Sequence, residues 1–333
     1  MIKEIKTNEN SPLILYPREK LIENVLLIEG CSRAGKFLMG NILCGFNEVE
    51  HYQYQELIEA LPYLMRFGFI DKEAGKALIQ CLIDGSVYNY LMGRTLNFRL
   101  VDKSCIYNDP RAHEYLQRTL QQNKEYALGK IKDEKTYFPF ITHELLPNLL
   151  FFFEMYPRLK IIHLERNPVD LVYSWYTKGW GKKYDSISIM FSVFMLGEKD
   201  PVPWYAHDWK EEYNSAGEMD RVIKSIITLI KLDKETYAEF TEEQKRKIYC
   251  LSYEKLLTET DQEIEKLGQF IGKAVLPEMR MVKAKEMLPA ADPREMRGEK
   301  LRIIKEKAGA DLFFKLMELE KEYDQKGSLL KMI

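Results

Sequence analysis

The chain has 333 residues, of which 46% are hydrophobic and 30% are charged, so it can bury a large core. Its formal net charge is only −2, which excludes the strongly basic surface typical of nucleic-acid-binding proteins. The longest apolar run, Leu149–Phe153, is far shorter than the roughly 20 residues of a membrane-spanning helix. Residues 1–10 are charged and lack the apolar segment of a signal peptide. We therefore expect a cytoplasmic protein with no membrane span and no nucleic-acid partner.

The cysteines and histidines do not suggest a metal site. No C-x-x-C pair is present, and no two of the five histidines stand four residues apart. We interpret His163, in an apolar run, as a hydrogen-bonded core residue. The cysteines are expected to be free, buried thiols in a reducing compartment; they are Cys31, Cys44, Cys81, Cys105 and Cys250.

Predicted strands and helices alternate along the chain, which is typical of parallel strands joined by crossover helices. This pattern predicts the α/β class. The predicted strands are Val25–Glu29, Phe98–Asp102, Lys160–Arg166 and Lys247–Tyr253. The predicted helices are Lys36–Cys44, Gln55–Phe67, Lys72–Ile83, His143–Met155, Pro168–Tyr176, Ser186–Leu196, Gly217–Glu239, Tyr253–Ile271 and Asp311–Tyr323. Two stretches, Lys199–Ser215 and Glu286–Lys300, are interpreted as irregular loops.

The domain organisation is simple, because no repeat or flexible linker interrupts this pattern. We predict a single domain over residues 1–333. Its core covers about 25–272, and a helical, basic segment follows at 273–333.

The first predicted strand runs into a helix through the turn Gly30–Gly35. Glycine allows a tight turn and a close approach of an anion, and the start of a helix presents unpaired N–H groups. Charge-assisted hydrogen bonds from Arg33 or Lys36 would help to hold a phosphate. The spacing also fits a Walker A loop, but Phe37 stands where a Ser or Thr should bind magnesium. An ordinary strand-to-helix turn is the alternative.

A second strand-to-helix turn follows Arg166. Asn167 suits the N-cap and Pro168 the first helical position, and Asp170 completes a pattern similar to a capping box. Arg166 leaves the carboxyl end of its strand, where open α/β sheets bind ligands, and Ser174 can present a hydroxyl to the same anion. An ion pair between Arg166 and a carboxylate is the alternative. Together, the two turns predict a ligand with phosphates at both ends of one nucleoside.

The two turns resemble the sulfotransferases that use 3′-phosphoadenosine 5′-phosphosulfate. In that family a P-loop-like turn holds the 5′-phosphosulfate, and an R-[ND]-P-x-x-x-x-x-S stretch binds the 3′-phosphate. Arg166-Asn167-Pro168 and Ser174 match the second element, and the turn from Gly30 to Gly35 matches half of the first. The resemblance implies a three-layer, P-loop NTPase-like fold with a central parallel sheet and helical elaborations.

The resemblance also implies donor contacts. These would come from Ser32, Arg33, Ala34, Gly35, Lys36, Phe37, Arg166, Ser174 and Tyr253, and from Arg297 in a late basic loop. The family usually has Ser-Gly-Thr-Thr where this chain has Ala34-Gly35-Lys36-Phe37, so hydroxyl donors are missing and the charge of Lys36 would replace them. Tyr253 begins a Y-E-x-L segment similar to one that lies near the nucleotide in relatives.

For catalysis the resemblance implies that Lys103, in Val101-Asp102-Lys103-Ser104, reaches the reaction centre, and that no metal is required. Relatives carry a general base, Glu or His, after the first helix. Here Glu50 is favoured, with His51, Glu56 and Glu48 as alternatives. The acceptor would be a small molecule or a glycan, and His207, among aromatic residues, is a candidate for its pocket.

Two other functions stay open at this point. One is a small-molecule P-loop kinase, with Asp102 as its Walker B acid. The other is a non-catalytic relative that only binds the nucleotide. The sequence does not predict the oligomeric state.

Overall fold

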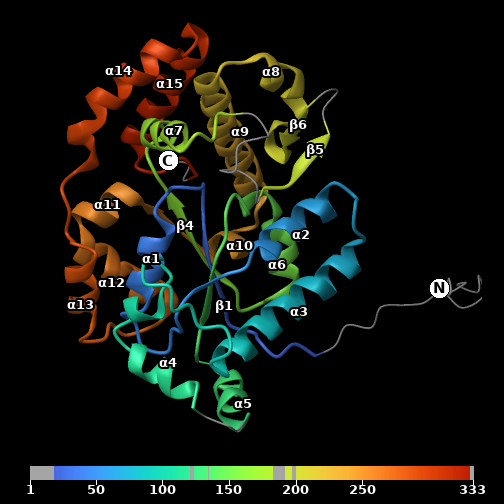
Figure 1. The fold of residues 1–333 in the computed structure, drawn as a ribbon, viewed down its shortest axis with the longest axis vertical. Coiled ribbons are helices and arrows are strands. Elements are labelled where there is room, and N and C mark those ends of the chain that lie inside the picture. Colours follow the sequence, from blue (N-terminus) through green and yellow to red (C-terminus); the bar gives the residue numbers. More distant parts are fainter. Residues whose placement is uncertain (1–18, 121–123, 134, 183–191, 197–199, 331–333) are drawn as a thin grey trace, which may run out of the picture.

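The computed structural model describes residues 19–120, 124–133, 135–182, 192–196 and 200–330. Its centre is a five-stranded sheet in the order β2-β3-β1-β4-β7, and all of its neighbouring strands are parallel (Figure 1). The strands are β1 (Val25–Glu29), β2 (Gln53–Tyr54), β3 (Phe138–Ile141), β4 (Lys160–Glu165) and β7 (Ile248–Ser252). The predicted α/β class with a parallel sheet is confirmed.

Helices cover both faces of this sheet. In Figure 1, α1, α11, α12 and α13 lie on one side of the strands and α2, α3 and α6 on the other. The bounds are α1 (Lys36–Leu43), α2 (Glu56–Arg66), α3 (Lys72–Leu91), α4 (Ala112–Arg118), α5 (Glu125–Lys132), α6 (Leu149–Met155), α7 (Pro168–Thr177), α8 (Lys210–Ser215), α9 (Glu218–Glu239), α10 (Glu242–Arg246), α11 (Tyr253–Thr258), α12 (Thr260–Ile271), α13 (Met279–Lys285), α14 (Arg297–Lys307) and α15 (Ala310–Lys326).

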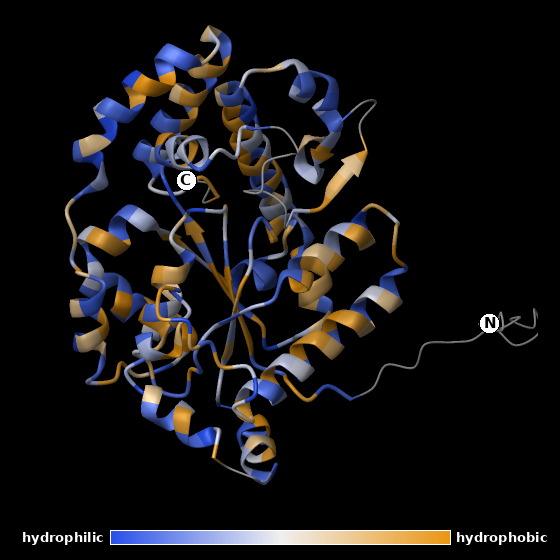
Figure 2. Cartoon of the chain, in the orientation of Figure 1, coloured by the Kyte–Doolittle hydropathy of each residue, from blue (hydrophilic) through white to orange (hydrophobic). Residues whose placement is uncertain are grey.

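Two hydrophobic cores result, because successive side chains of a strand point to opposite faces. Leu26 and Ile28 of β1 join the core that includes α1, α7, α9 and α12. Val25 and Leu27 join the core that includes α2, α3 and α6. A strand that is apolar on both faces suits the middle of a parallel sheet. Figure 2 shows hydrophilic residues gathered on outer helices such as α14.

One predicted strand is wrong, and two strands of the central sheet, β2 and β3, were missed. Phe98–Asp102 forms turns, with Leu100 and Val101 74% and 78% exposed. Local hydrogen bonds replace strand pairing there, since the Asn97 side chain accepts from the Arg99 N–H. Asp102 therefore does not follow a strand, and the Walker B interpretation is wrong. The longer of the two is β3, whose Pro139 is typical of a strand breaker although it lies in register with Leu26 of β1.

Other boundaries also differ from the expectations. Residues 201–215 are not irregular, because they form β6 (Pro201–Pro203), a 3-10 helix (Trp204–Trp209) and α8. The predicted helix Ser186–Leu196 ends instead in β5 (Phe194–Leu196), which pairs antiparallel with β6, and its first part lies outside the described residues. Further differences concern three predicted segments. The predicted helix Tyr253–Ile271 is broken at Glu259, and α6 begins at Leu149 and not at the predicted His143. The last part of Glu286–Lys300, predicted to be irregular, forms a 3-10 helix (Pro293–Met296) and the start of α14.

Four of the five cysteines are buried as expected, but Cys81 is exposed, and none of the five forms a disulfide bond. Among the helices described, none is both long and apolar enough to cross a bilayer.

Candidate functional site

The turn between β1 and α1 is built around left-handed backbone. Gly30, Arg33 and Gly35 have φ angles of 136°, 76° and 106°. A Cβ on Gly30 would lie 2.3 Å from the carbonyl oxygen of Leu164, so the turn and β4 approach each other as only glycine allows. The start of α1 then points its unpaired N–H groups into the space beyond β1.

Lys36 lies beneath this turn. Its ammonium group is buried and donates hydrogen bonds to the carbonyl oxygens of Gly30 (2.5 Å) and Cys31 (2.8 Å). Burial lowers the pKa of Lys36, although the nearby carboxylates of Glu144 and Glu29 oppose that shift. The lysine thus places a cation at the base of the turn.

The second turn meets the first. Arg166 Nη1 donates to the carbonyl oxygen of Arg33 (2.8 Å), and Arg33 Nε donates to Ser174 Oγ (3.1 Å). The Arg166 guanidinium also lies over the ring of Tyr253, 4.6 Å from its centroid. The structure therefore brings together four residues that the sequence assigned to one donor site.

The start of α7 is held differently from the predicted capping box. The Asn167 side chain accepts from Val169 N (2.9 Å) as expected, but the Asn167 N–H donates to Glu254 Oε1 (3.0 Å). Asp170 instead accepts from Lys300 of α14. The predicted capping box is therefore wrong. Glu254 of α11, and not Asp170, accepts from the Asn167 N–H, and Asp170 binds Lys300 of α14 instead.

A cavity of about 690 Å³ opens beside the joined turns. Its walls come from α1, α2, α7 and α11 and from the segments after β3, before β5, after β6 and after α13. Ser32, Arg33, Gly35, Lys36, Phe37, Lys103, Arg166 and Tyr253 of the predicted site line it, while Ala34 is buried behind the turn. Lys103 is exposed, with its ammonium 3.6 Å from Glu286 Oε2 across the same cavity.

His143 lines the cavity and was not predicted as a site residue. It stands two residues after β3, and Glu59 Oε2 lies 3.1 Å from its Nδ1 and 2.6 Å from its backbone nitrogen. Because a carboxylate can only accept here, the pair favours the tautomer with hydrogen on Nδ1 and a lone pair on Nε2. The signal in the sequence was a histidine just after the apolar stretch Phe138–Ile141.

Glu144 also lines the cavity, with a left-handed φ of 49°. Its carboxylate accepts a hydrogen bond from Ser32 N in the first turn (2.5 Å). Burial raises the pKa of Glu144, although Lys36 and His143 oppose that shift. A carboxylate from the segment after β3 is thus bound to the turn between β1 and α1.

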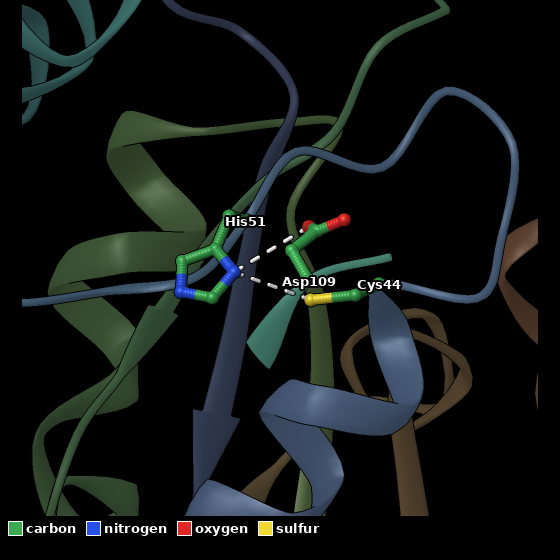
Figure 3. Close-up of side chains that lie close together, drawn as sticks. All are labelled: Cys44, His51 and Asp109. Carbon is green, nitrogen blue, oxygen red and sulfur yellow. Dashed lines mark hydrogen bonds and ion pairs between the residues drawn. The ribbon is translucent and has the colours of Figure 1, made fainter. Parts of the chain in front are cut away.

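The four residues predicted as general bases lie away from this cavity lining. Glu48 pairs with Lys273, with 2.7 Å between its Oε2 and the ammonium group. Glu50 is buried in a bidentate ion pair with Arg118 (2.8 and 3.0 Å), and Glu56 is exposed at the first position of α2. His51 is buried beside Cys44 and Asp109, with its Nδ1 3.4 Å from both Sγ and Oδ2 (Figure 3). These placements argue against a role as base.

The cluster of Cys44, His51 and Asp109 is compact enough to hold a metal ion. However, Arg111 already donates to both Asp109 oxygens (3.2 Å each). Although burial opposes it, these bonds and His51 hold the pKa of Asp109 well below its usual range. We therefore interpret the cluster as an ion-pair network. It supports the segment that carries Lys103, since His51 Nε2 lies 3.1 Å from the Ser104 carbonyl oxygen.

Three further predicted residues also lie outside the cavity lining. Ser174 contacts the lining through Arg33, which donates to its hydroxyl (3.1 Å). Arg297 is only 7% exposed and pairs with Asp324 (3.0 Å) and Glu320 (3.4 Å), which argues against a contact with the donor. His207 is exposed beside Asp208, so its placement does not support a role in the acceptor pocket.

Comparisons with known proteins identify the family of this chain. A family model described as a sulfotransferase domain matches residues 25–288. The solved sulfotransferase domain from the Synechococcus PCC 7002 olefin synthase is similar at 11% identity and a TM-score of 0.45, covering 94% of this chain and 98% of that one. The sulfotransferase domain from the curacin biosynthetic pathway is similar at 11% identity and a TM-score of 0.43, covering 78% and 77%. No curated protein sequence matches significantly. Since the family model spans most of the chain, from the start of β1 to three residues beyond α13, the protein belongs to the sulfotransferase domain family.

Proposed function

We propose that this protein transfers a sulfuryl group from 3′-phosphoadenosine 5′-phosphosulfate to a hydroxyl group of a small acceptor. The observation that carries the proposal is the junction of the two turns. Arg166 donates to the backbone of Arg33, and Arg33 donates to Ser174, at the carboxyl ends of the adjacent strands β1 and β4. A nucleoside with phosphates at both ends needs two cationic sites at such close range.

The donor would lie across this junction. The N–H groups at the start of α1, with Lys36 beneath them, suit the 5′-phosphosulfate. Arg166 and Ser174 suit the 3′-phosphate, and the ring of Tyr253 suits the base between them. The charge of Lys36 would compensate for the hydroxyl groups that this turn lacks.

His143 is our candidate for the general base, in place of Glu50. The acceptor oxygen would attack sulfur, its proton would pass to His143 Nε2, and the bond from sulfur to the 5′-phosphate oxygen would break. The products are the sulfate ester and adenosine 3′,5′-bisphosphate. Glu59 would orient the imidazole and stabilise its protonated form through Nδ1.

Cationic groups would stabilise the electron pair that departs on the 5′-phosphate oxygen. Lys36, Arg33 and Lys103 all line the cavity. Because this stabilisation comes from fixed cations and N–H dipoles, the reaction is expected to need no magnesium ion.

Calorimetry with the bisphosphate product tests the donor site without an acceptor. We expect binding of adenosine 3′,5′-bisphosphate that is much tighter than binding of ATP with magnesium. Arg166→Ala should weaken it by about 1.5–3 kcal/mol, roughly ten- to hundredfold. Arg302→Ala is the matched control, since Arg302 pairs only with Glu306 on the outer helix α14 among the contacts described.

Three outcomes would contradict the proposal. A preference for ATP with magnesium would indicate a kinase, and unchanged binding in Arg166→Ala would make Arg166 structural. Tight bisphosphate binding with no transfer of labelled sulfate to any acceptor would indicate a nucleotide-binding relative without catalytic activity.

A further inference from the structure

A continuous chain of aromatic rings forms the cavity wall beyond the two turns. Tyr63 stacks on Trp204 at 4.0 Å between centroids, and Trp204 meets Tyr205 edge-on at 5.6 Å. Tyr205 in turn contacts Trp175 (6.1 Å), and Trp175 contacts Trp180 (5.1 Å). All five side chains line the cavity, so we call them the aromatic wall.

The aromatic wall begins next to the candidate base. The hydroxyl of Tyr63 donates to the carbonyl oxygen of Glu144, the residue that follows His143. The ring of Tyr54 also meets the imidazole of His143 edge-on, at 5.3 Å. An acceptor whose hydroxyl group reaches His143 would therefore lay the rest of its body against these rings.

Several polar groups at this end of the cavity are already bound within the protein. Trp175 Nε1 donates to the Ser32 carbonyl oxygen (2.8 Å), and the Tyr54 hydroxyl donates to Glu59 Oε1 (3.1 Å). The two nearby carboxylates are also engaged, Glu59 by His143 and Glu144 by Ser32. The wall consequently presents ring faces and edges to an acceptor.

The remaining described lining near the wall is small and mostly apolar. It adds Ala60, Val193 and one hydroxyl group, that of Ser192. The cationic side chains Arg33, Lys36 and Arg166 belong to the donor end. The cavity therefore has a cationic end at the two turns and an aromatic wall, and the pair of Lys103 and Glu286 (3.6 Å) also lines it.

This arrangement discriminates between acceptor classes. Aromatic rings can stack on a sugar, but each further hydroxyl of a saccharide also needs a hydrogen-bond partner when it is desolvated. An aromatic alcohol has one hydroxyl to satisfy, and its flat, apolar body gains from burial against rings.

We infer that the acceptor is a hydroxyl group on a flat, apolar ring system, with phenols as the simplest class, and not a saccharide. This inference rests on the proposed function. The phenolic O–H loses its proton to His143 as the oxygen–sulfur bond forms, and the 5′-phosphate oxygen of the donor keeps the electron pair of the broken bond.

The test uses the full chain, with labelled 3′-phosphoadenosine 5′-phosphosulfate and two acceptors at equal concentration, 2-naphthol and N-acetylglucosamine. We expect transfer to 2-naphthol, with at least a hundredfold lower rate for the sugar. Trp204→Leu should raise the KM for 2-naphthol about tenfold and leave the Kd of adenosine 3′,5′-bisphosphate within twofold. Trp209→Leu is the matched control, because Trp209 follows on the same 3-10 helix but is absent from the described cavity lining.

Different results would overturn the acceptor class and the proposed function. Transfer to N-acetylglucosamine at a rate equal to or above that for 2-naphthol would overturn the acceptor class alone. The same holds for equal KM values in Trp204→Leu and Trp209→Leu. Failure of the wild-type chain to bind the bisphosphate would overturn the proposed function, and the acceptor inference with it.

Discussion

The carboxylate of Glu144 accepts a hydrogen bond from the backbone N–H of Ser32, with 2.5 Å between the two atoms. A carboxylate therefore already accepts from one N–H group of the turn that we propose to bind the phosphosulfate. Glu144 is buried, and its left-handed backbone is uncommon for a residue with a side chain. Such strain at a cavity is consistent with a functional role.

We expect Glu144→Gln to bind adenosine 3′,5′-bisphosphate about tenfold more tightly, which corresponds to about 1.4 kcal/mol. The amide keeps a hydrogen-bond acceptor for Ser32 and removes a negative charge that repels the ligand. Calorimetry at one pH measures the difference. Weaker binding in the variant would show that the carboxylate supports the turn.

The same residue predicts a pH dependence. Burial raises the pKa of Glu144, so protonation neutralises it at a higher pH than an exposed glutamate. Affinity for the bisphosphate should therefore increase as the pH falls through this raised pKa. Lys36, His143 and Glu59 face the same carboxylate, and the ligand itself titrates, so the decisive quantity is the difference between wild type and Glu144→Gln. A difference that does not change with pH would contradict the prediction.

His143→Ala should lower kcat by about 10² to 10⁴, the range typical of a lost general base, while bisphosphate affinity changes little. Glu59→Gln should lower kcat less and alter its pH profile, because the amide can no longer stabilise a charged imidazole. Steady-state kinetics across pH measure both effects. His207→Ala is the control, since His207 is exposed and pairs with Asp208. A kcat of His143→Ala equal to that of His207→Ala would exclude the base.

The buried pair of His163 and Glu29 predicts how stability depends on pH. Although burial opposes it, the Glu29 carboxylate raises the pKa of His163 to about 9. A histidine whose pKa rises on folding stabilises the protein below its unfolded pKa of about 6.5. That contribution should be lost as the pH increases from about 6.5 to about 9. Denaturant unfolding at several pH values should show this loss in wild type and a smaller one in His163→Gln; equal slopes would contradict it.

Local signals explain why the two turns of the candidate donor site could be predicted. The glycines after β1 and the Asn-Pro pair after β4 each specify a strand-to-helix turn within a few residues. Parallel pairing of β1 and β4 then brings the two turns together. The expectation for His163 as a hydrogen-bonded core residue follows from the same apolar strand and is confirmed.

The residues that could not be predicted depend on partners far away in the sequence. His143 is a candidate base because Glu59, 84 residues earlier in the sequence, binds and orients it. It also follows a strand that is hard to recognise in the sequence, because Pro139 is typical of a strand breaker. Arg297 reads as a free cation in a loop because its acidic partners, Glu320 and Asp324, stand on another helix. Spacing alone carries no information about such pairs.

The end of the described chain bears on the donor site through Glu165. Its Oε1 accepts hydrogen bonds from Leu329 N (2.8 Å) and Leu330 N (3.2 Å), and it directly precedes Arg166. Ending the chain after Gly327 would leave a buried carboxylate without these donors, at a cost of about 1–3 kcal/mol. We expect a lower free energy of unfolding and, because Glu165 positions the residue that follows it, weaker binding of the bisphosphate.

Combining the truncation with Glu165→Gln separates the two contributions. The amide tolerates burial better than an unpaired carboxylate, so it should restore part of the lost stability. Denaturant unfolding measures the stability, and calorimetry measures the affinity. If the truncated chain unfolds and binds like wild type, the contact between Glu165 and the chain end makes no contribution to the donor site.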